Sequence, residues 1–250
     1  MSTDWPAGYG KRVLDVVDST LSEAARIAPT LTGPEWILAL HQTAARGRRG
    51  RAWANPAGNF SATLVLQLNE EPANAALRSF VAALALYDTC VAVTGRSEGF
   101  ALKWPNDVLL NGGKLAGILL ESTAQTRGTT DLTIGIGVNL VAAPARHEVE
   151  TRALPPVSLS NETGALVEPE VFLTHLAVAY ARYETQLKTY GFEPIRKLWL
   201  TRAARLGQEI TARTGNSDTT GTFETVDPMG NLVLNTDRGR ICIAAADIFF

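Results

Sequence analysis

The alternation of apolar and polar positions predicts that much of the chain between residues 13 and 140 forms a β-sheet. Residues 60–68 place Phe60, Leu64 and Leu68 on one face, which predicts a half-buried strand, and residues 131–140 alternate in the same way. Shorter apolar runs predict further strands at residues 13–17, 36–40, 100–104, 108–110 and 115–120.

Turn and cap residues separate these strands from the predicted helices. Asn111-Gly-Gly113, between the last two short strands, is typical of a hairpin turn. Thr20 and Glu23 have the spacing of a capping box, which predicts a helix over residues 20–27 with Thr20 as its N-cap. Further helices are predicted at 72–95, 169–190 and 194–206, with irregular segments at 41–59 and 141–165.

The pattern changes after Gly207, where helical stretches stop and short strands recur between glycine-bearing turns. The predicted strands are residues 209–213, 221–226, 232–235 and 240–244. A run of this kind indicates a small β-barrel that needs a neighbour to pack against. We therefore predict an α+β protein with a main domain at residues 1–206 and a second domain at residues 207–250.

Composition narrows the function classes. The chain has 250 residues, 46% of them hydrophobic, and a net charge of −2. This charge excludes the class of basic proteins that coat nucleic acid with their whole surface. Cys90 and Cys242 show no metal-ligand spacing and favour a reducing compartment. The first residues lack the apolar core of a secretory signal, and the apolar run at residues 80–87 is too short to span a bilayer. We expect a cytoplasmic protein with no membrane partner.

The first candidate for chemistry is the segment Arg46-Gly-Arg-Arg-Gly-Arg51, here called the arginine loop. No Asp or Glu occurs between residues 36 and 69, so its four guanidiniums form an uncompensated positive window. Arginine pairs in bidentate fashion with phosphate or carboxylate oxygens, and Gly47 lets the backbone approach a ligand. The segment is equally typical of a solvated basic loop, and the sequence favours neither interpretation.

A second candidate is the polar face of residues 131–140. Gly135 and Gly137 leave a shelf without side chains, on which a ligand or another backbone must press. Taken alone, this pattern more often reflects tight packing within a sheet.

Two further groups of polar residues follow strand ends or begin a helix. Lys103, Asn106 and Asp107 lie just before the predicted hairpin, and Lys114 begins the returning strand. Ser19 and Thr20 stand at a helix N-terminus, where free amides bind polar ligands. Turn formation, an edge charge and simple capping explain each group in isolation. The three histidines have no metal spacing, and hydrolase, Walker and dinucleotide motifs are missing from the sequence.

In combination and in this order, the motifs resemble those of biotin–protein ligases. The resemblance rests on Asp18-Ser-Thr20, Gln42-Thr-Ala-Ala-Arg-Gly-Arg-Arg-Gly-Arg-Ala-Trp53, Lys103-Trp-Pro-Asn-Asp-Val-Leu-Leu-Asn-Gly-Gly-Lys-Leu-Ala-Gly117 and Gly135-Ile-Gly-Val-Asn139. It implies a mixed α/β catalytic domain related to class II synthetases and an SH3-like C-terminal barrel. It also implies that ATP, with Mg²⁺, converts biotin to biotinyl-5′-AMP. A lysine of a biotin carboxyl carrier protein domain, as in acetyl-CoA carboxylase, then takes the biotin.

The resemblance also implies roles for individual residues. Ser19, Thr20 and Gln42 would bind the ureido ring, and Gly47, Gly117, Gly135 and Gly137 would line the biotin site. Arg46 and Arg48 would hold the carboxylate and α-phosphate, and Lys114 would bridge the biotinyl carbonyl and the phosphate. Arg51, Trp53, Lys103, Asn106 and Asn139 would contact ATP, and Asp107 would orient or deprotonate the acceptor lysine or meet Mg²⁺.

The sequence departs from the family pattern at two positions. Ala45 stands where glycine is usual, and Leu21 stands where asparagine is frequent. We expect activity with altered loop dynamics or biotin affinity. Only 17 residues precede Asp18, so a winged helix and operator binding are not expected. The alternatives are a ligase for lipoate or octanoate and nucleic-acid binding by the arginine loop. The oligomeric state, monomer or homodimer, is left open.

Overall fold

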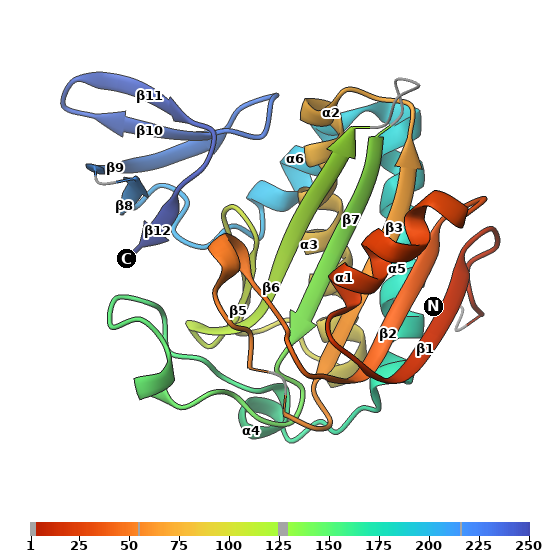
Figure 1. The fold of residues 1–250 in the computed structure, drawn as a ribbon. Helices are drawn as coiled ribbons and strands as arrows, with labels where there is room; N and C mark the ends of the chain where they lie inside the picture. Colours follow the sequence, from red (N-terminus) through yellow and green to blue (C-terminus); the bar gives the residue numbers. More distant parts are fainter. Residues whose placement is uncertain (1–3, 55, 125–129, 216) are drawn as a thin grey trace.

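The computed structural model describes residues 4–54, 56–124, 130–215 and 217–250, and only the backbone of Arg48 and Ala124. Its main sheet has seven strands in the order β1-β2-β3-β7-β6-β5-β4 (Figure 1). Strands β1 and β2 are parallel, and all other neighbours are antiparallel. The strands are β1 (Gly10–Val17), β2 (Glu35–Gln42), β3 (Phe60–Leu68), β4 (Phe100–Lys103), β5 (Asp107–Leu110), β6 (Gly113–Ala124) and β7 (Thr130–Val138).

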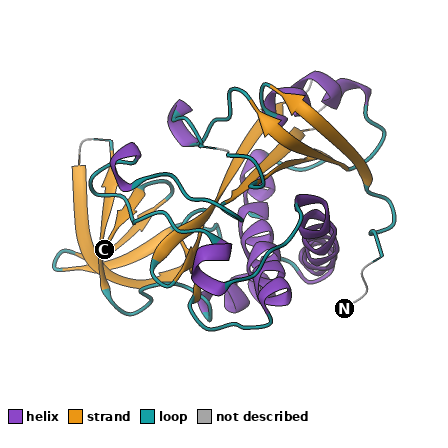
Figure 2. Ribbon diagram, turned by 90° about the horizontal axis from the view of Figure 1, so that it is seen from below, coloured by secondary structure: helices purple, strands orange, loops and turns teal. Residues whose placement is uncertain are grey.

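Helices cover both faces of this sheet, as Figure 2 shows. Helices α3 and α5 pack on one face, with α6 against these two helices, and α1 lies on the other face against β2, β3 and β7. The helices are α1 (Thr20–Ile27), α2 (Pro72–Ala76), α3 (Arg78–Thr94), α4 (Leu159–Thr163), α5 (Pro169–Tyr190) and α6 (Phe192–Leu200). Short 3-10 turns are η1 (Ala28–Thr30), η2 (Arg48–Gly50) and η3 (Arg146–Glu148).

The C-terminal residues form a second, five-stranded antiparallel sheet in the order β11-β10-β9-β8-β12. Figure 2 shows these strands gathered at one end of the molecule, beside the C-terminus. The strands are β8 (Glu209–Thr214), β9 (Ser217–Val226), β10 (Leu232–Thr236), β11 (Gly239–Ile243) and β12 (Asp247–Phe249). The α+β class is confirmed, whereas the division at residues 206 and 207 stays a prediction.

The strand β3 is buried on both faces, so the prediction of a half-buried strand is wrong. Leu64 and Leu66 belong to the main core between the sheet and helices α3, α5 and α6. Val65 belongs to a second, smaller core under α1, together with Ile37 and Ala24. Alternation in the sequence could not show that α1 covers the second face.

Local signals explain several element ends and fail at others. Asn111 and Gly112 both have positive φ, 50° and 80°, which the two-residue hairpin turn requires. The N-cap of α1 is Ser19, whose Oγ accepts a hydrogen bond from the Leu21 amide, so the predicted cap at Thr20 is wrong by one residue. Thr20 lies inside the helix because its amide and hydroxyl both donate to Gln42.

Several segments differ from their prediction, and three of the differences are larger than a shift of element ends. The helix predicted at 72–95 is two helices that meet at Leu77. The last predicted helix ends at Leu200 rather than 206, because the backbone of Arg202 and Ala204 instead exchanges hydrogen bonds with Leu102 on β4. The strand β12 was not predicted at all, since three residues are too short for a periodic signal.

The apolar stretch at residues 72–94 is longer than the run that the sequence analysis singled out. It is long and apolar enough to cross a membrane, but 61% of its most apolar window is buried inside the protein. Leu84 and Leu86 on α3 have no exposed surface. The stretch is therefore a core segment.

Both cysteines are free in the described structure. Cys90 is fully enclosed, and burial raises the pKa of its thiol to about 12. A thiol that stays protonated is a poor nucleophile, so Cys90 acts as a small apolar core residue.

Candidate active site

A cavity of about 740 Å³ opens on the α1 side of the main sheet. It is bounded by the N-terminus of α1, the arginine loop, the β4–β5 connection, the glycines of β6 and β7, residues 144–156 and strand β12. Fifteen of the predicted site residues line it: Ser19, Thr20, Gln42, Arg46, Gly47, Arg51, Trp53, Lys103, Asn106, Asp107, Lys114, Gly117, Gly135, Gly137 and Asn139. The remaining one, Arg48, has a side chain that lies outside the described structure.

A hydrogen-bond network of neutral groups forms the end of the cavity at α1. Gln42 Oε1 accepts from the Thr20 amide at 2.7 Å and from its hydroxyl at 3.2 Å. Thr63 on β3 donates to the Thr20 hydroxyl at 2.8 Å. These groups are preorganised donors and acceptors at a helix N-terminus, suited to an uncharged polar ligand.

Thr63 was not among the predicted site residues. The strand β3 carries only Ser61, Thr63 and Gln67 as polar residues in an otherwise apolar run. Ser61 pairs with Gly137 and Thr63 with Gly135 in the register of β3 and β7. The polar positions of β3 were therefore a usable signal, because they share a face with the glycine shelf.

Two large side chains lie on the predicted glycine shelf. A Cβ at Gly137 would come within 2.6 Å of the Trp53 indole, and one at Gly135 within 3.0 Å of Leu21. A Cβ at Gly117 would meet Trp53 at 3.3 Å. The glycines thus let the Trp53 indole lie close to the sheet backbone. The sequence predicted that a ligand or another backbone would contact this surface, and in the structure the side chains of Trp53 and Leu21 do so.

Gly137→Ala is expected to weaken about tenfold the binding of a ligand that contacts the Trp53 indole, because the added methyl group displaces the indole from its position. A fluorescence titration with the nucleotide that the sequence resemblance implies measures this change. Gly33→Ala is the matched control, since its Cβ would meet nothing closer than 4.0 Å and should leave the affinity unchanged. Wild-type affinity in Gly137→Ala would show that the position of the indole does not matter for binding.

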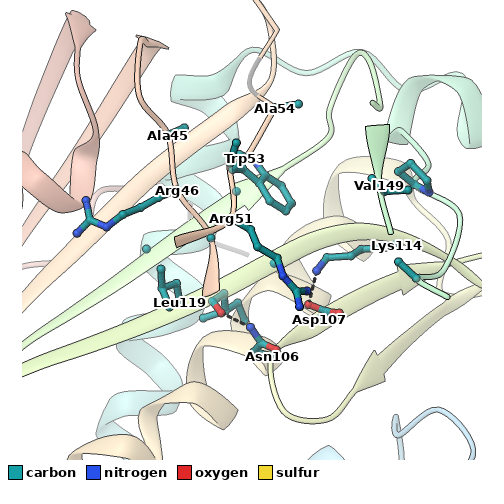
Figure 3. Close-up of a pocket in the computed structure, with 18 of the residues that line it drawn as sticks. Ala45, Arg46, Arg51, Trp53, Ala54, Asn106, Asp107, Lys114, Leu119 and Val149 are labelled. Carbon is teal, nitrogen blue, oxygen red and sulfur yellow. Dashed lines mark hydrogen bonds and ion pairs between the residues drawn. The ribbon is translucent and has the colours of Figure 1, made fainter. Parts of the chain in front are cut away.

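Two lysines where β4, β5 and β6 meet share the carboxylate of Asp107. Lys114 Nζ lies 2.8 Å from Asp107 Oδ1, and Lys103 Nζ lies 3.9 Å from Asp107 Oδ2. The Lys114 ammonium also lies 5.7 Å from the centre of the Trp53 ring. Strand register produces this corner, because Asp107 pairs with Lys103 on one side and with Gly117 on the other. Figure 3 shows Lys114 and Asp107 facing each other below Trp53.

Two asparagines of the cavity wall are fixed by backbone groups. Asn106 donates from its side chain to the Ile118 carbonyl and accepts from the Ile118 amide through its own carbonyl. Asn139 is 2% exposed and donates to Val157, while its Oδ1 has no hydrogen-bond partner in the described structure. A buried acceptor without a donor is costly, so the Asn139 Oδ1 is suited to a ligand N–H.

The arginine loop is not the uncompensated positive segment that its sequence indicates. Arg46 pairs with Glu121 at 2.8 Å and donates to Ser22, and Figure 3 shows it pointing away from Lys114 and Asp107. The other two described guanidiniums pair with Glu150 and Asp247. All three carboxylates come from segments far from the loop in sequence, so a search for nearby acids could not find them.

The two departures from the family pattern have definite structural outcomes. Ala45 does not adopt a positive φ; the described non-glycine residues that do so are Arg49, Asn111 and Arg205. Alanine at position 45 is therefore free of the backbone strain that the missing glycine suggested. Leu21 is 4% exposed and packs on Gly135, so this part of the wall is apolar.

The matches to known proteins cover both regions of the chain. Residues 13–139 match the biotin/lipoate A/B protein ligase family, and residues 206–250 match the biotin protein ligase C-terminal domain. The biotin–[acetyl-CoA-carboxylase] ligase of Paracoccus denitrificans is 55% identical over 93% of this chain and 97% of its own length.

The chain belongs to the biotin/lipoate A/B protein ligase family. Within that family, the bifunctional ligase/repressor BirA of Bacillus subtilis is 32% identical over 94% of this chain and 72% of its own length. The fold is that of the biotin protein ligase from Aquifex aeolicus in complex with biotin and ATP, with a TM-score of 0.79 and 23% identity over 96% of this chain and 98% of that one. The resemblance inferred from the motifs is confirmed at the level of family and fold.

Proposed function

We propose that the chain uses ATP to activate biotin as biotinyl-5′-AMP and transfers the biotin to a lysine of a biotin carboxyl carrier protein domain. The observation that carries this proposal is the single cavity in which the polar network of Thr20, the glycine shelf and the cations at Lys114 and Arg51 meet. The 55% identity to a biotin–[acetyl-CoA-carboxylase] ligase supports the choice of substrate.

The first step joins two anions, so its barrier depends on positive charge in the site. A biotin carboxylate oxygen attacks the α-phosphorus of ATP, the bond to the bridging oxygen breaks, and pyrophosphate leaves. Lys114 is placed to stabilise the developing charge, since it stands between the shelf at Gly117 and the carboxylate of Asp107. Arg46 and Arg51 would hold carboxylate and phosphates once they leave their present partners, and Lys103 is a further cation of the wall that would contact ATP.

In the second step, the neutral ε-amine of the acceptor lysine attacks the acyl carbon of the adenylate. AMP leaves with the electron pair of the broken anhydride bond, and the amine loses a proton as the amide forms. We assign Asp107 the task of orienting or deprotonating this lysine, because a ligand that draws Lys114 toward phosphate frees the carboxylate.

The two polar regions of the cavity indicate where each substrate would bind. The neutral network of Ser19, Thr20 and Gln42 suits the ureido ring of biotin, which has both N–H donors and a carbonyl acceptor. Trp53 offers a flat surface for adenine, and the unpartnered Asn139 Oδ1 can accept from an amino group.

We assign Mg²⁺ to the phosphates of the nucleotide. Among the described residues, no three His, Cys, Asp or Glu side chains form a group that could hold a metal ion. Mg²⁺ that arrives with ATP keeps most of its water and phosphate ligands, and the ion would supply charge neutralisation there. Asp107, which faces Lys103 and Lys114, is the carboxylate that we assign to contact with this ion.

The position of the arginine loop argues against nucleic-acid binding. Arg46 and Arg51 line the cavity, and Arg46, Arg49 and Arg51 are paired with Glu121, Asp247 and Glu150. A non-specific nucleic-acid site needs several cations spread along an open surface, where they contact successive phosphates. We further propose that the enzyme works in the cytoplasm, without DNA or a membrane, as a monomer or a homodimer.

One assay tests the proposal: purified protein, biotin, ATP, Mg²⁺ and a carrier domain, scored by streptavidin blot. Biotinylation that requires ATP is expected, and lipoate or octanoate should form no adenylate under the same conditions. Gln42→Ala should raise the KM for biotin because the Thr20 amide loses its acceptor at 2.7 Å. Adenylation of lipoate but not of biotin would show that the ligase serves a different acid.

A further inference from the structure

The strand β12 carries a carboxylate, Asp247, from the C-terminal sheet to the wall of the cavity. In Figure 1 this strand lies beside the orange segment that contains the arginine loop. Asp247 Oδ2 lies 2.6 Å from Arg49 Nη1 and 3.6 Å from Arg51 Nη2. One oxygen therefore faces two guanidiniums, which is how a phosphate oxygen is held in a polyphosphate site.

The position of Asp247 is fixed by the second sheet rather than by the loop. Asp247 pairs with Arg213 in the register of β12 and β8. Phe249, two residues further on, lies under the guanidiniums of Arg152 and Arg213, at 4.7 and 5.1 Å from its ring centre. The carboxylate is 19% exposed, whereas the Arg49 and Arg51 side chains are about half exposed. The second sheet thus fixes the carboxylate of Asp247, and the arginine loop folds against it so that Arg49 and Arg51 contact this carboxylate.

The loop adopts an unfavourable backbone at this contact. Arg49 has φ 57° and ψ 27°, in the left-handed region that side chains other than glycine, asparagine and aspartate seldom occupy. Two guanidiniums close together would also repel each other without an anion between them. Arg51 has Glu150 at 2.9 Å as its nearer anion, so Asp247 is the anion of Arg49 and a second one for Arg51. The carboxylate of Asp247 offsets the repulsion when no nucleotide is bound.

We propose that Asp247 is an internal anion that occupies the polyphosphate position between Arg49 and Arg51 and is displaced when the nucleotide binds. This inference rests on the proposed function, since it assigns the phosphates of ATP to the arginine loop. A tethered carboxylate has a high effective concentration at the two arginines. A lone small anion displaces it poorly, whereas a polyphosphate that contacts several cations at once displaces it well.

The test is the affinity of the full chain for inorganic pyrophosphate and for ATP, measured by isothermal titration calorimetry. Asp247→Asn should bind both about three- to fivefold more tightly than the wild type, the range expected for losing a half-exposed competing ion pair. The KM for ATP should fall by the same factor, and kcat for adenylate formation should not change. Asp247→Glu, which keeps a carboxylate at this position, should bind both ligands with the affinity of the wild type.

Asp218→Asn is the matched control. It makes the same charge change in the same sheet, but its partners are Arg213 at 2.7 Å and Arg152 at 3.3 Å, which lie outside the arginine loop. Its affinity for pyrophosphate should equal that of the wild type. An equal gain in both variants would mean that only the net charge matters, and would overturn the proposal.

A double-mutant cycle separates a direct effect from a change in folding. In an Arg49→Gln background, Asp247→Asn should change pyrophosphate affinity less than in the wild type, because the shared contact is already gone. Wild-type or weaker binding by Asp247→Asn would overturn the inference. The comparison needs no biotin, so it remains decisive even if the wild type fails to biotinylate a carrier domain.

Discussion

Lys114→Ala is expected to lower kcat for biotinyl-5′-AMP formation about a hundredfold, equal to a loss of about 3 kcal/mol of transition-state stabilisation. Lys114 is one third exposed at the cavity, and its ammonium lies 3.6 Å from the Cβ position of Gly117 and 2.8 Å from Asp107. No other described ammonium contacts both the glycine shelf and this carboxylate. Biotin-dependent release of pyrophosphate from ATP measures the effect.

The control for this prediction is Lys197→Ala. Lys197 is 73% exposed on α6 and pairs with Glu193, far from the cavity lining. It should keep the wild-type rate. If Lys114→Ala also kept a rate close to that of the wild type, the assigned charge stabilisation by Lys114 would be wrong. Lys114→Arg should recover only part of the rate, because a planar guanidinium does not replace a compact ammonium.

Arg78→Ala is expected to lower the free energy of unfolding by about 3–5 kcal/mol, because it removes one side of a buried ion pair. Arg78 is 1% exposed and donates to Glu184 at 2.9 Å and to Glu70 at 2.9 Å. Glu184 is itself buried and would keep only Lys188 and Tyr180 as partners in the described structure. Urea unfolding monitored by circular dichroism measures the loss.

The same variant should change how stability depends on pH. Hydrogen bonds from Arg78 lower the pKa of Glu70, against a smaller opposing effect of burial. A lowered pKa stabilises the folded state above the ordinary value of 4.5, and this contribution is lost as the pH falls below it. Arg78→Ala should therefore lose less stability than the wild type between neutral and acid pH.

Arg182→Ala serves as the control for Arg78. Arg182 lies on α5, the helix that carries Glu184, pairs with Asp88 and is half exposed, so its loss should cost no more than about 1 kcal/mol. A similar cost for both variants would indicate that helix propensity or general charge, rather than the buried pair, determines stability here.

Elements with strong local periodicity were predictable, two of them to the residue and the strand β7 to within two residues. The strand β3 and the helix α5 have the predicted bounds, residues 60–68 and 169–190. The hairpin at Asn111 also follows its local signal, because two consecutive positive φ angles demand residues of that type. These features depend on neighbouring residues along the chain, which a sequence displays directly.

Elements that depend on distant partners were predicted less well. The helix α6 stops at Leu200 because the next residues bond to β4, and nothing in their own sequence requires this. The N-cap is Ser19 rather than the predicted Thr20, whose amide and hydroxyl both donate to Gln42 on β2. In each case a long-range hydrogen bond outweighed a local preference.

For the site, the sequence by itself determined which chemical groups are present. The arginine loop, Lys114 with Asp107, and the glycines of β7 are local motifs, and their residue types already indicated an anion beside a flat surface. They were sufficient to assign the family and to name fifteen of the residues that line the cavity, whereas the lining from residues 144–156 and from β12 was not predicted.

Only the tertiary structure decided how those groups are paired. Glu121, Glu150 and Asp247 neutralise the arginine loop from three segments that lie about 70 to 200 residues further along the chain. Trp53, from the segment after the arginine loop, and Leu21, from helix α1, cover the glycine shelf, although both are remote from it in sequence. Charge and van der Waals contacts act through space, and distances between remote segments are set by packing of the whole chain rather than by any local pattern.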